Sequence, residues 1–183
     1  MSGGLKGWAG RLLHRSGSDV TDDTASRLAP AQTFCAIGDI HGCNDLLRPL
    51  YQTLRSDCGP DVPVVFLGDM VDRGPDSRPV LTFIHDLCRT LPEAHIALMG
   101  NHEAMMIDFL DAPEASGVRW IHYGGRETLI SFGIDVPPGH SDPAVLGDLR
   151  DQLIEAMSPD LPNWLRTLPS RWSTGHVHFV HAA

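Results

Sequence analysis

The sequence of 183 residues predicts a single α/β domain built on a largely parallel sheet. Short apolar runs alternate with amphipathic helical patterns along its first two thirds, and this alternation is typical of βαβ units. The hydrophobic content of 42% and the charged content of 20% are those of an ordinary globular protein. The length suits one domain with a sizeable core.

The predicted elements follow one another without internal repeats. The first strand covers 33–37 and ends at Gly38, and a leucine pattern over 46–54 predicts a helix that Asn44 could cap. The next units repeat this order: strand 62–67, helix 80–91, strand 95–99 and a helix through 105–110. The remaining sequence predicts helices over 120–132, 143–157 and 162–169 and a last strand over 177–180.

Two local features refine this division. Asp142 and Pro143 have the order of a cap and a first helical turn at the start of the helix 143–157. Residues 1–31 are rich in Gly, Ser, Asp and Thr, so we expect a poorly ordered N-terminal tail followed by one domain over 32–183.

The composition excludes several classes of partner. A formal net charge of −9 leaves no basic surface to dominate binding to nucleic acid or to anionic lipid. No apolar run approaches membrane-spanning length. The four cysteines form no C-x-x-C pair and are typical of reduced thiols, so we expect a cytoplasmic location.

Three polar clusters follow the three predicted strands: GDIHG at 38–42, GDMVDRG at 68–74 and GNHE at 100–103. Asp39 and Asp69 lie 30 residues apart, and Asn101 follows 32 residues later, about one βαβ unit each time. Because sites in α/β sheets form at the carboxyl ends of the strands, we expect these side chains to meet. Crowded carboxylates, an imidazole and an amide oxygen need a cation, and mixed N and O ligands suit Mn, Fe or Zn.

A plainer interpretation exists for each residue alone. An Asp after a strand often only caps the next helix, and Asn101 could do the same for the helix that follows it. His41 could be a core residue. The shared placement of all three clusters favours the metal site.

The three clusters resemble the signature blocks of the phosphoprotein phosphatase family of serine/threonine phosphatases, within the calcineurin-like metallophosphoesterases, and the bacterial and phage branch is the most similar. The resemblance implies a sandwich of two mixed β-sheets flanked by helices, and two divalent metal ions, with manganese favoured over iron or zinc. It implies these residue roles: Asp39, His41 and Asp69 as ligands of one metal, Asp69, Asn101 and His181 as ligands of the other, His102 and Asp72 as catalytic residues, and Arg73 as the phosphate-binding residue.

The resemblance also implies a mechanism. A metal-bridging hydroxide would attack phosphorus in line, His102 would protonate the leaving group, and Asp72 would orient His102. The favoured function is a phosphomonoesterase that acts on phosphoserine or phosphothreonine in proteins, or on a phosphorylated small molecule. Hydrolysis of dinucleoside polyphosphates such as diadenosine tetraphosphate is a second hypothesis, and a non-catalytic relative that binds metal or phosphate is a third.

Two further expectations concern Glu103 and the C-terminal part of the sequence. Glu103 is expected to support the start of the following helix, although its presence together with Asp72 and Arg73 also favours the protein phosphatase. The resembled family continues past the strand before His181 with a further histidine and arginine, whereas this sequence stops at Ala183. We therefore expect a domain that lacks its C-terminal strands, and the sheet surface exposed in this way could self-associate.

Overall fold

The computed structural model describes residues 29–138 and 141–181, so most of the tail predicted at 1–31 lies outside the described residues. Among the helices of this described part, none has the length and hydrophobicity needed to cross a membrane.

The centre of the fold is a three-stranded parallel sheet formed by β1 (Cys35–Ile37), β2 (Val64–Phe66) and β3 (His95–Ala97), with β2 in the middle. Ile37, Phe66 and Ala97 stand in register at the carboxyl ends of the strands. The three polar clusters therefore leave the sheet at the same edge, as predicted.

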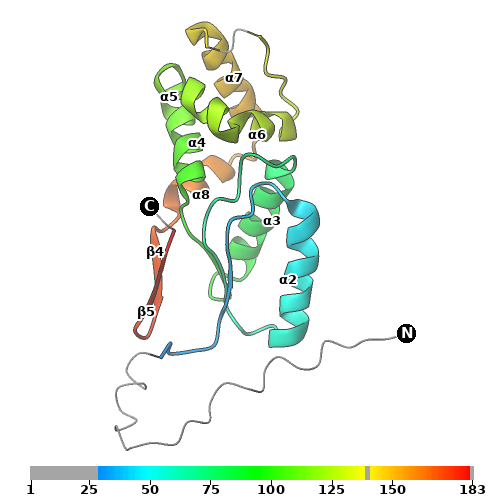
Figure 1. The fold of residues 1–183 in the computed structure, drawn as a ribbon, viewed down its shortest axis with the longest axis vertical. Helices are drawn as coiled ribbons and strands as arrows, with labels where there is room; N and C mark the ends of the chain where they lie inside the picture. The colour runs from blue at the N-terminus through cyan, green and yellow to red at the C-terminus, as the bar shows by residue number, and fades with distance from the viewer. Residues whose placement is uncertain (1–28, 139–140, 182–183) are drawn as a thin grey trace, which may run out of the picture.

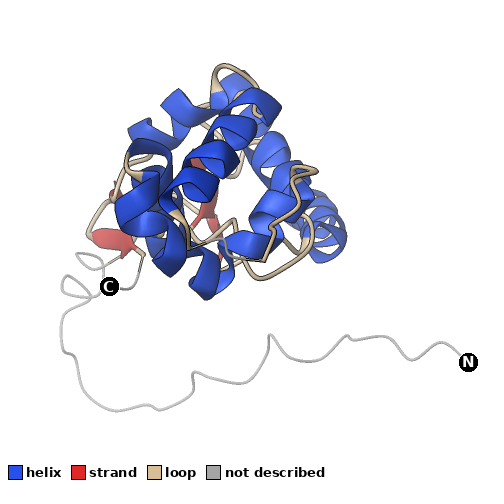
Figure 2. Ribbon diagram, turned by 90° about the horizontal axis from the view of Figure 1, so that it is seen from above, coloured by secondary structure: helices blue, strands red, loops and turns tan. Residues whose placement is uncertain are grey.

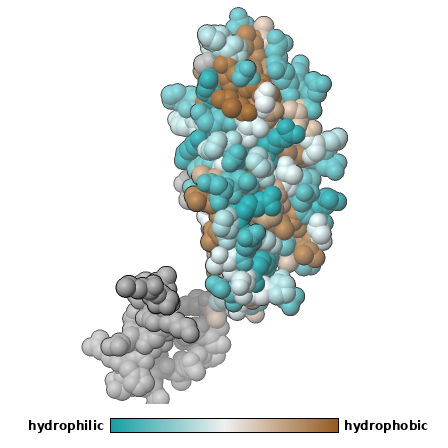
Figure 3. Space-filling view, turned by 90° about the vertical axis from the view of Figure 1, so that its right-hand side faces the viewer, coloured by the Kyte–Doolittle hydropathy of each residue, from teal (hydrophilic) through white to brown (hydrophobic). Residues whose placement is uncertain are grey.

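Helices α2 (Asn44–Cys58) and α3 (Ser77–Thr90) lie beside the sheet (Figure 1). Only Leu47 of α2 is fully buried, whereas Leu46 is 67% exposed and Leu50 46% exposed, so the predicted apolar stripe is only partly used. Figure 3 views this side of the molecule, where hydrophobic residues lie among hydrophilic ones. The predicted Asn44 cap is wrong, because Asn44 is itself the first helical residue and its side-chain oxygen accepts from Arg48 instead.

The remaining helices gather at the carboxyl edge of the parallel strands (Figure 1): α4 (Asn101–Asp111), α5 (Pro113–Trp120), α6 (Arg126–Ser131), α7 (Pro143–Ala156) and α8 (Leu161–Thr167). The prediction of a single helix over 120–132 was wrong, because a π-helical turn over Ile121–Gly125 separates α5 from α6. Gly124 lies there at φ +116°, outside any helical conformation. The Asp142 cap is confirmed, since its carboxylate accepts from the Ala144 amide at 2.9 Å.

A separate antiparallel hairpin consists of β4 (Arg171–Thr174), which was not predicted, and β5 (Val177–Val180). Phe34, just before β1, packs edge-on against Phe179 at 4.8 Å between ring centroids. The hairpin therefore brings the chain back beside the segment that precedes β1 and ends directly before His181 (Figure 1).

The predicted α/β fold with two sheets and flanking helices is confirmed. Seen from above, helices surround the central strands, and a further strand lies at the edge of the fold near the C-terminus (Figure 2). Within the described residues one sheet is entirely parallel and the other antiparallel, instead of each being mixed. The core continues from the sheet into the upper helices, where the rings of Phe109 and Trp120 stack at 4.6 Å.

Candidate active site

Backbone hydrogen bonds hold the first polar loop against the second. The amides of Ile40 and His41 both donate to the Asp69 carbonyl at 2.9 Å, and the Gly42 amide donates to the Met70 carbonyl at 3.0 Å. His41 and Asp69 have positive φ angles of 43° and 51°. Such angles are uncommon for residues other than glycine and persist where the surroundings fix the backbone. The two loops thus present their side chains in one rigid arrangement.

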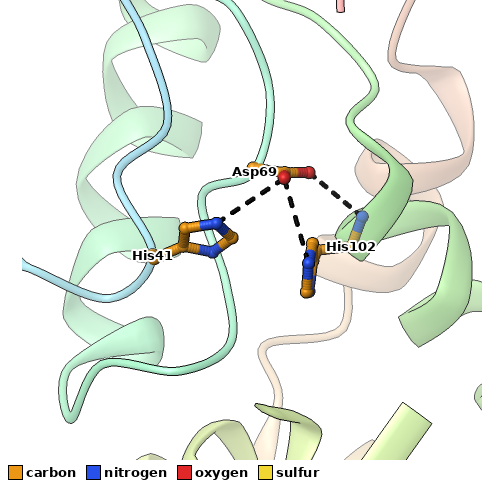
Figure 4. Close-up of side chains that lie close together, drawn as sticks. All are labelled: His41, Asp69 and His102. Atoms are coloured by element: carbon orange, nitrogen blue, oxygen red, sulfur yellow. Dashed lines mark hydrogen bonds and ion pairs between the residues drawn. The ribbon is translucent and has the colours of Figure 1, made fainter. Parts of the chain in front are cut away.

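The Asp69 carboxylate lies at the centre of this arrangement. One of its oxygens, Oδ2, is 3.6 Å from His41 Nε2 and 3.9 Å from His102 Nε2 (Figure 4). The other oxygen, Oδ1, is 3.3 Å from His181 Nε2. Asp69 is only 4% exposed, so one buried carboxylate faces three imidazoles.

Two of these imidazoles have the orientation of metal ligands. His41 Nδ1 is 2.9 Å from the Val71 carbonyl, and His181 Nδ1 is 2.8 Å from the Leu67 carbonyl. A carbonyl only accepts, so the proton of each neutral ring is on Nδ1 and the lone pair is on Nε2, toward Asp69. A backbone contact of this kind fixes the ring of a metal-ligating histidine.

The donor atoms form two sets that share Asp69: one contains His41, Asp69 and His102, and the other Asp39, Asp69 and His181. Within each set the donor atoms lie within 4.8 Å of one another. Asn101 Oδ1 is 3.0 Å from His181 Nε2 and adds an amide oxygen to the second set.

The five predicted ligands therefore all lie around Asp69. His41 belongs to the first donor set and Asp39 and His181 to the second, and His102, which was predicted as a catalytic residue, also lies in the first set. The mixture of carboxylate, imidazole and amide donors fits the divalent ions that the sequence suggested.

Asp72 forms the buried support of His102. Its Oδ2 accepts from His102 Nδ1 at 2.8 Å and from Trp120 Nε1 at 3.0 Å, and its Oδ1 accepts from the Thr128 hydroxyl at 2.7 Å. The hydrogen bond to Asp72 raises the pKa of His102 above its ordinary value, although burial opposes this. Burial raises the pKa of Asp72, and its three side-chain hydrogen bonds oppose that shift.

Sequence reasoning assigned no role to Trp120 or Thr128. They lie 48 and 56 residues from Asp72, in the helices α5 and α6. The Asp72 amide also donates to the hydroxyls of Thr128 and Ser77, at 2.9 and 3.1 Å. No local pattern predicts these contacts, because only the packing of the helices on the loop brings the residues to Asp72.

Glu103 organises the loops from inside the protein. Its side chain is fully buried, and its carboxylate accepts four backbone N–H groups, from Asp69, Met70, Val71 and Gly100, at 2.7 to 3.2 Å. The predicted support of the helix start is confirmed, and Glu103 additionally holds the Asp69 loop. Burial raises the pKa of Glu103 to about 7. A Cβ atom at Gly100 would lie 2.3 Å from Asp69 Oδ1, so no side chain fits at that position.

Arg73 lies at the exposed mouth of the site. Its Nη1 is 2.9 Å from His41 Nε2, and its Nη2 is 3.0 Å from His102 Nε2. Its backbone has φ +68°, and its amide donates to the Gly124 carbonyl at 3.1 Å. A Cβ atom at Gly124 would lie 2.7 Å from the Arg73 amide, so this close approach requires glycine. The guanidinium is thus directed at the donor atoms, where a bound phosphate would need it.

Two related bacterial proteins match most of the chain. Symmetrical bis(5'-nucleosyl)-tetraphosphatases from Burkholderia pseudomallei (strain 668) and Burkholderia mallei (strain SAVP1) are each 30% identical over 173 residues. The match covers 78% of this chain and 57% of each relative, so the chain spans little more than half the length of these proteins.

Solved structures show weaker likenesses. A cold-active protein tyrosine phosphatase has a TM-score of 0.49 and 22% identity, over 89% of this chain and 46% of its own. A protein serine/threonine phosphatase from Saccharomyces cerevisiae has a TM-score of 0.41 and 18% identity, over 81% of this chain and 40% of its own. The family model for calcineurin-like phosphoesterases matches residues 32–181, which include every polar cluster described above. The chain therefore belongs to the calcineurin-like phosphoesterase family.

Proposed function

We propose that this protein is a metal-dependent phosphoesterase that hydrolyses dinucleoside tetraphosphates. The observation that supports hydrolysis is the Asp69 carboxylate, which two sets of N and O donors share beside the His102–Asp72 pair. The 30% identity to symmetrical bis(5'-nucleosyl)-tetraphosphatases favours this substrate over a phosphoprotein. Glu103, which had favoured the protein phosphatase, is fully buried and bonded to backbone amides, so it does not contact a substrate.

The ligands of the two ions would be the five predicted residues: Asp39, His41, Asp69, Asn101 and His181. When bound there, divalent ions polarise phosphoryl oxygens and lower the pKa of coordinated water. The backbone contacts of His41 and His181 keep the Nε2 lone pairs directed at Asp69, so the protein holds its donors in place before any ion enters.

His102 is better suited to carry a proton than to bind a metal. A ligating imidazole must be neutral, whereas the hydrogen bond to Asp72 raises the pKa of His102 and favours the protonated ring. With Nδ1 bonded to Asp72, the proton on Nε2 would be available to the oxygen of the leaving group. Asp72 holds the ring in this orientation.

Arg73 would bind the phosphate group. Its guanidinium offers a planar fork that matches two phosphate oxygens. In the structure the two ends of the same fork lie 2.9 and 3.0 Å from His41 Nε2 and His102 Nε2, so a phosphate held by this fork would lie beside Asp69.

Parallel assays would test the substrate. With Mn²⁺ added, we expect diadenosine tetraphosphate to be hydrolysed to ADP and a phosphoserine peptide to be left intact at equal concentrations. Turnover of the phosphopeptide alone would refute the proposed substrate. Absence of turnover of both would refute the proposed activity for this chain.

The variant His102→Asn would test the role of the acid. We expect kcat for diadenosine tetraphosphate to fall by about 10²–10⁴-fold, with Mn²⁺ affinity retained. His122→Asn is the matched control, since that ring is exposed and lies outside both donor sets. A large loss of Mn²⁺ affinity in His102→Asn would instead identify His102 as a ligand.

A further inference from the structure

The side chains of Cys35 and Cys58 meet on the side of the fold that carries α2. Cys35 is the first residue of β1, Cys58 is the last residue of α2, and their Sγ atoms are 3.2 Å apart. A disulfide bond is about 2.05 Å long, so the two sulfur atoms need to approach by only about 1 Å. Cys35 is half-buried and Cys58 exposed, so small reagents reach the pair.

The surrounding backbone holds the two residues in this position. The Cys35 amide donates to the Pro63 carbonyl at 2.8 Å, which fixes the start of β1 against the segment before β2. Arg55, one turn before Cys58, donates to the carbonyls of Gly59 and Val62 at 3.3 and 2.6 Å. The end of α2 is therefore tied to the same segment as Cys35, and the proximity of the thiols follows from the fold.

We propose that Cys35 and Cys58 are a site of covalent modification, at which a small disulfide oxidant such as oxidised glutathione forms an intramolecular cross-link. The Cys58 thiolate attacks the oxidant, forms a mixed disulfide and releases one glutathione. Cys35 then gives up its proton, and its sulfur attacks the Cys58 sulfur and releases the second glutathione. The protein dithiol is oxidised to a disulfide, and one oxidised glutathione is reduced to two thiols.

The oxidant reacts first with the thiol of Cys58, because that side chain is exposed. Burial and the hydrogen bond with Cys58 raise the pKa of Cys35, so Cys35 is the weaker first nucleophile. The other two cysteines have no thiol partner at this distance in the described part of the chain. Burial also raises the pKa of Cys88 to about 11, which keeps that thiol unreactive.

The cross-link would enclose a unit of the fold that buries few of its side chains. The closed loop contains β1, the turn with Asp39 and His41, and α2, whose only fully buried residue is Leu47. By comparison, α3 buries Ser77, Val80, Leu81, Ile84 and His85. A bond between residues 23 positions apart restricts the unfolded chain. We expect oxidation to stabilise the first metal-binding loop more than any other part.

Peptide mapping and thermal unfolding would test this proposal. After treatment with oxidised glutathione, mass spectrometry of non-reduced peptides should find Cys35 linked to Cys58, and two of the four thiols should remain in the denatured protein. The Tm should rise by about 5–15 °C and return on reduction. Hydrogen exchange in α2 should slow.

Two variants provide the controls. Cys58→Ser changes an exposed side chain, should fold normally and should show no rise in Tm on oxidation. Cys43→Ser should keep the full rise, and it also removes the other cysteine near Cys35 in sequence. Dimers linked through Cys58, a linkage to Cys43 or Cys88, or a rise in Tm that persists in Cys58→Ser would overturn the proposal.

Discussion

The candidate site has a buried half and an exposed half, which the protein supports in different ways. In the buried half, Asp69, Asp72, His102 and Glu103 are at most 4% exposed. In the exposed half, Asp39 and Asn101 are exposed and His181 is partly buried. The buried carboxylates receive hydrogen bonds from several loops and helices, whereas the exposed Asn101 side chain lies 3.0 Å from His181 Nε2.

The residues of the two halves are therefore expected to contribute differently to folding and to metal binding. Residues of the buried half belong to the core as well as to the site, because an unsatisfied buried polar group costs about 1–3 kcal/mol. Asp39 and Asn101 of the exposed half stand in water when no ion is bound, and their removal leaves few groups without partners. Substitutions in the first half should therefore affect folding and chemistry together, and substitutions in the second should affect metal binding alone.

The largest effect is expected for Glu103→Gln. The amide nitrogen of Gln has no lone pair for the backbone N–H groups that one Glu103 oxygen accepts, so two buried donors lose their acceptor. We expect the free energy of unfolding to fall by about 3–5 kcal/mol, measured by urea denaturation without metal.

Glu155→Gln is the matched control for this variant. It changes an exposed side chain of α7 and should shift stability by no more than about 0.5 kcal/mol. An equally small effect for Glu103→Gln would show that the Asp69 loop holds its conformation without Glu103.

A smaller and pH-dependent loss of unfolding free energy is expected for Asp72→Asn. Asp72 raises the pKa of His102, so the pair contributes stability below the ordinary histidine pKa of about 6.5, and this contribution is lost as the pH rises through the raised pKa of folded His102. The difference in unfolding free energy between wild type and Asp72→Asn should be about 2–3 kcal/mol at pH 6 and smaller at pH 9. A difference that grew with pH would contradict the assigned pair.

The smallest effect on folding is expected in the exposed half. Asp39→Asn should change the free energy of unfolding by no more than about 0.5 kcal/mol without metal, because the side chain is exposed. Its Mn²⁺ affinity should nevertheless fall by at least about 10–100-fold in calorimetric titration. Loss of folding without loss of metal binding would reverse the proposed division between the halves.

The sequence predicted those parts of the site, in both halves, that depend on the order of strands and loops along the chain. Asp39, Asp69 and Asn101 could be placed together because each follows a strand of one parallel sheet, and the spacing of those strands is visible in the sequence. Gly68 and Gly100, which precede Asp69 and Asn101, are also visible in the sequence, and a Cβ atom at either position would clash with the neighbouring loop.

The contacts of Asp72 could not be predicted in this way. Trp120 and Thr128 reach Asp72 only because α5 and α6 pack over the loop, and the kink at Gly124 that separates those helices is set by a close approach to Arg73. The exposure of Leu46 and Leu50 was missed for a related reason. A helical stripe indicates which face of a helix is apolar, and tertiary packing decides how much of that face is covered.

The most direct test of the shared carboxylate is anomalous diffraction from crystals of this protein soaked with Mn²⁺. We predict two ions about 3.5–4 Å apart, with the Asp69 carboxylate between them and the Nε2 atoms of His41 and His181 on different ions. A single ion that does not touch Asp69, or two ions bound elsewhere, would contradict the two-metal centre and the phosphoesterase proposed from it.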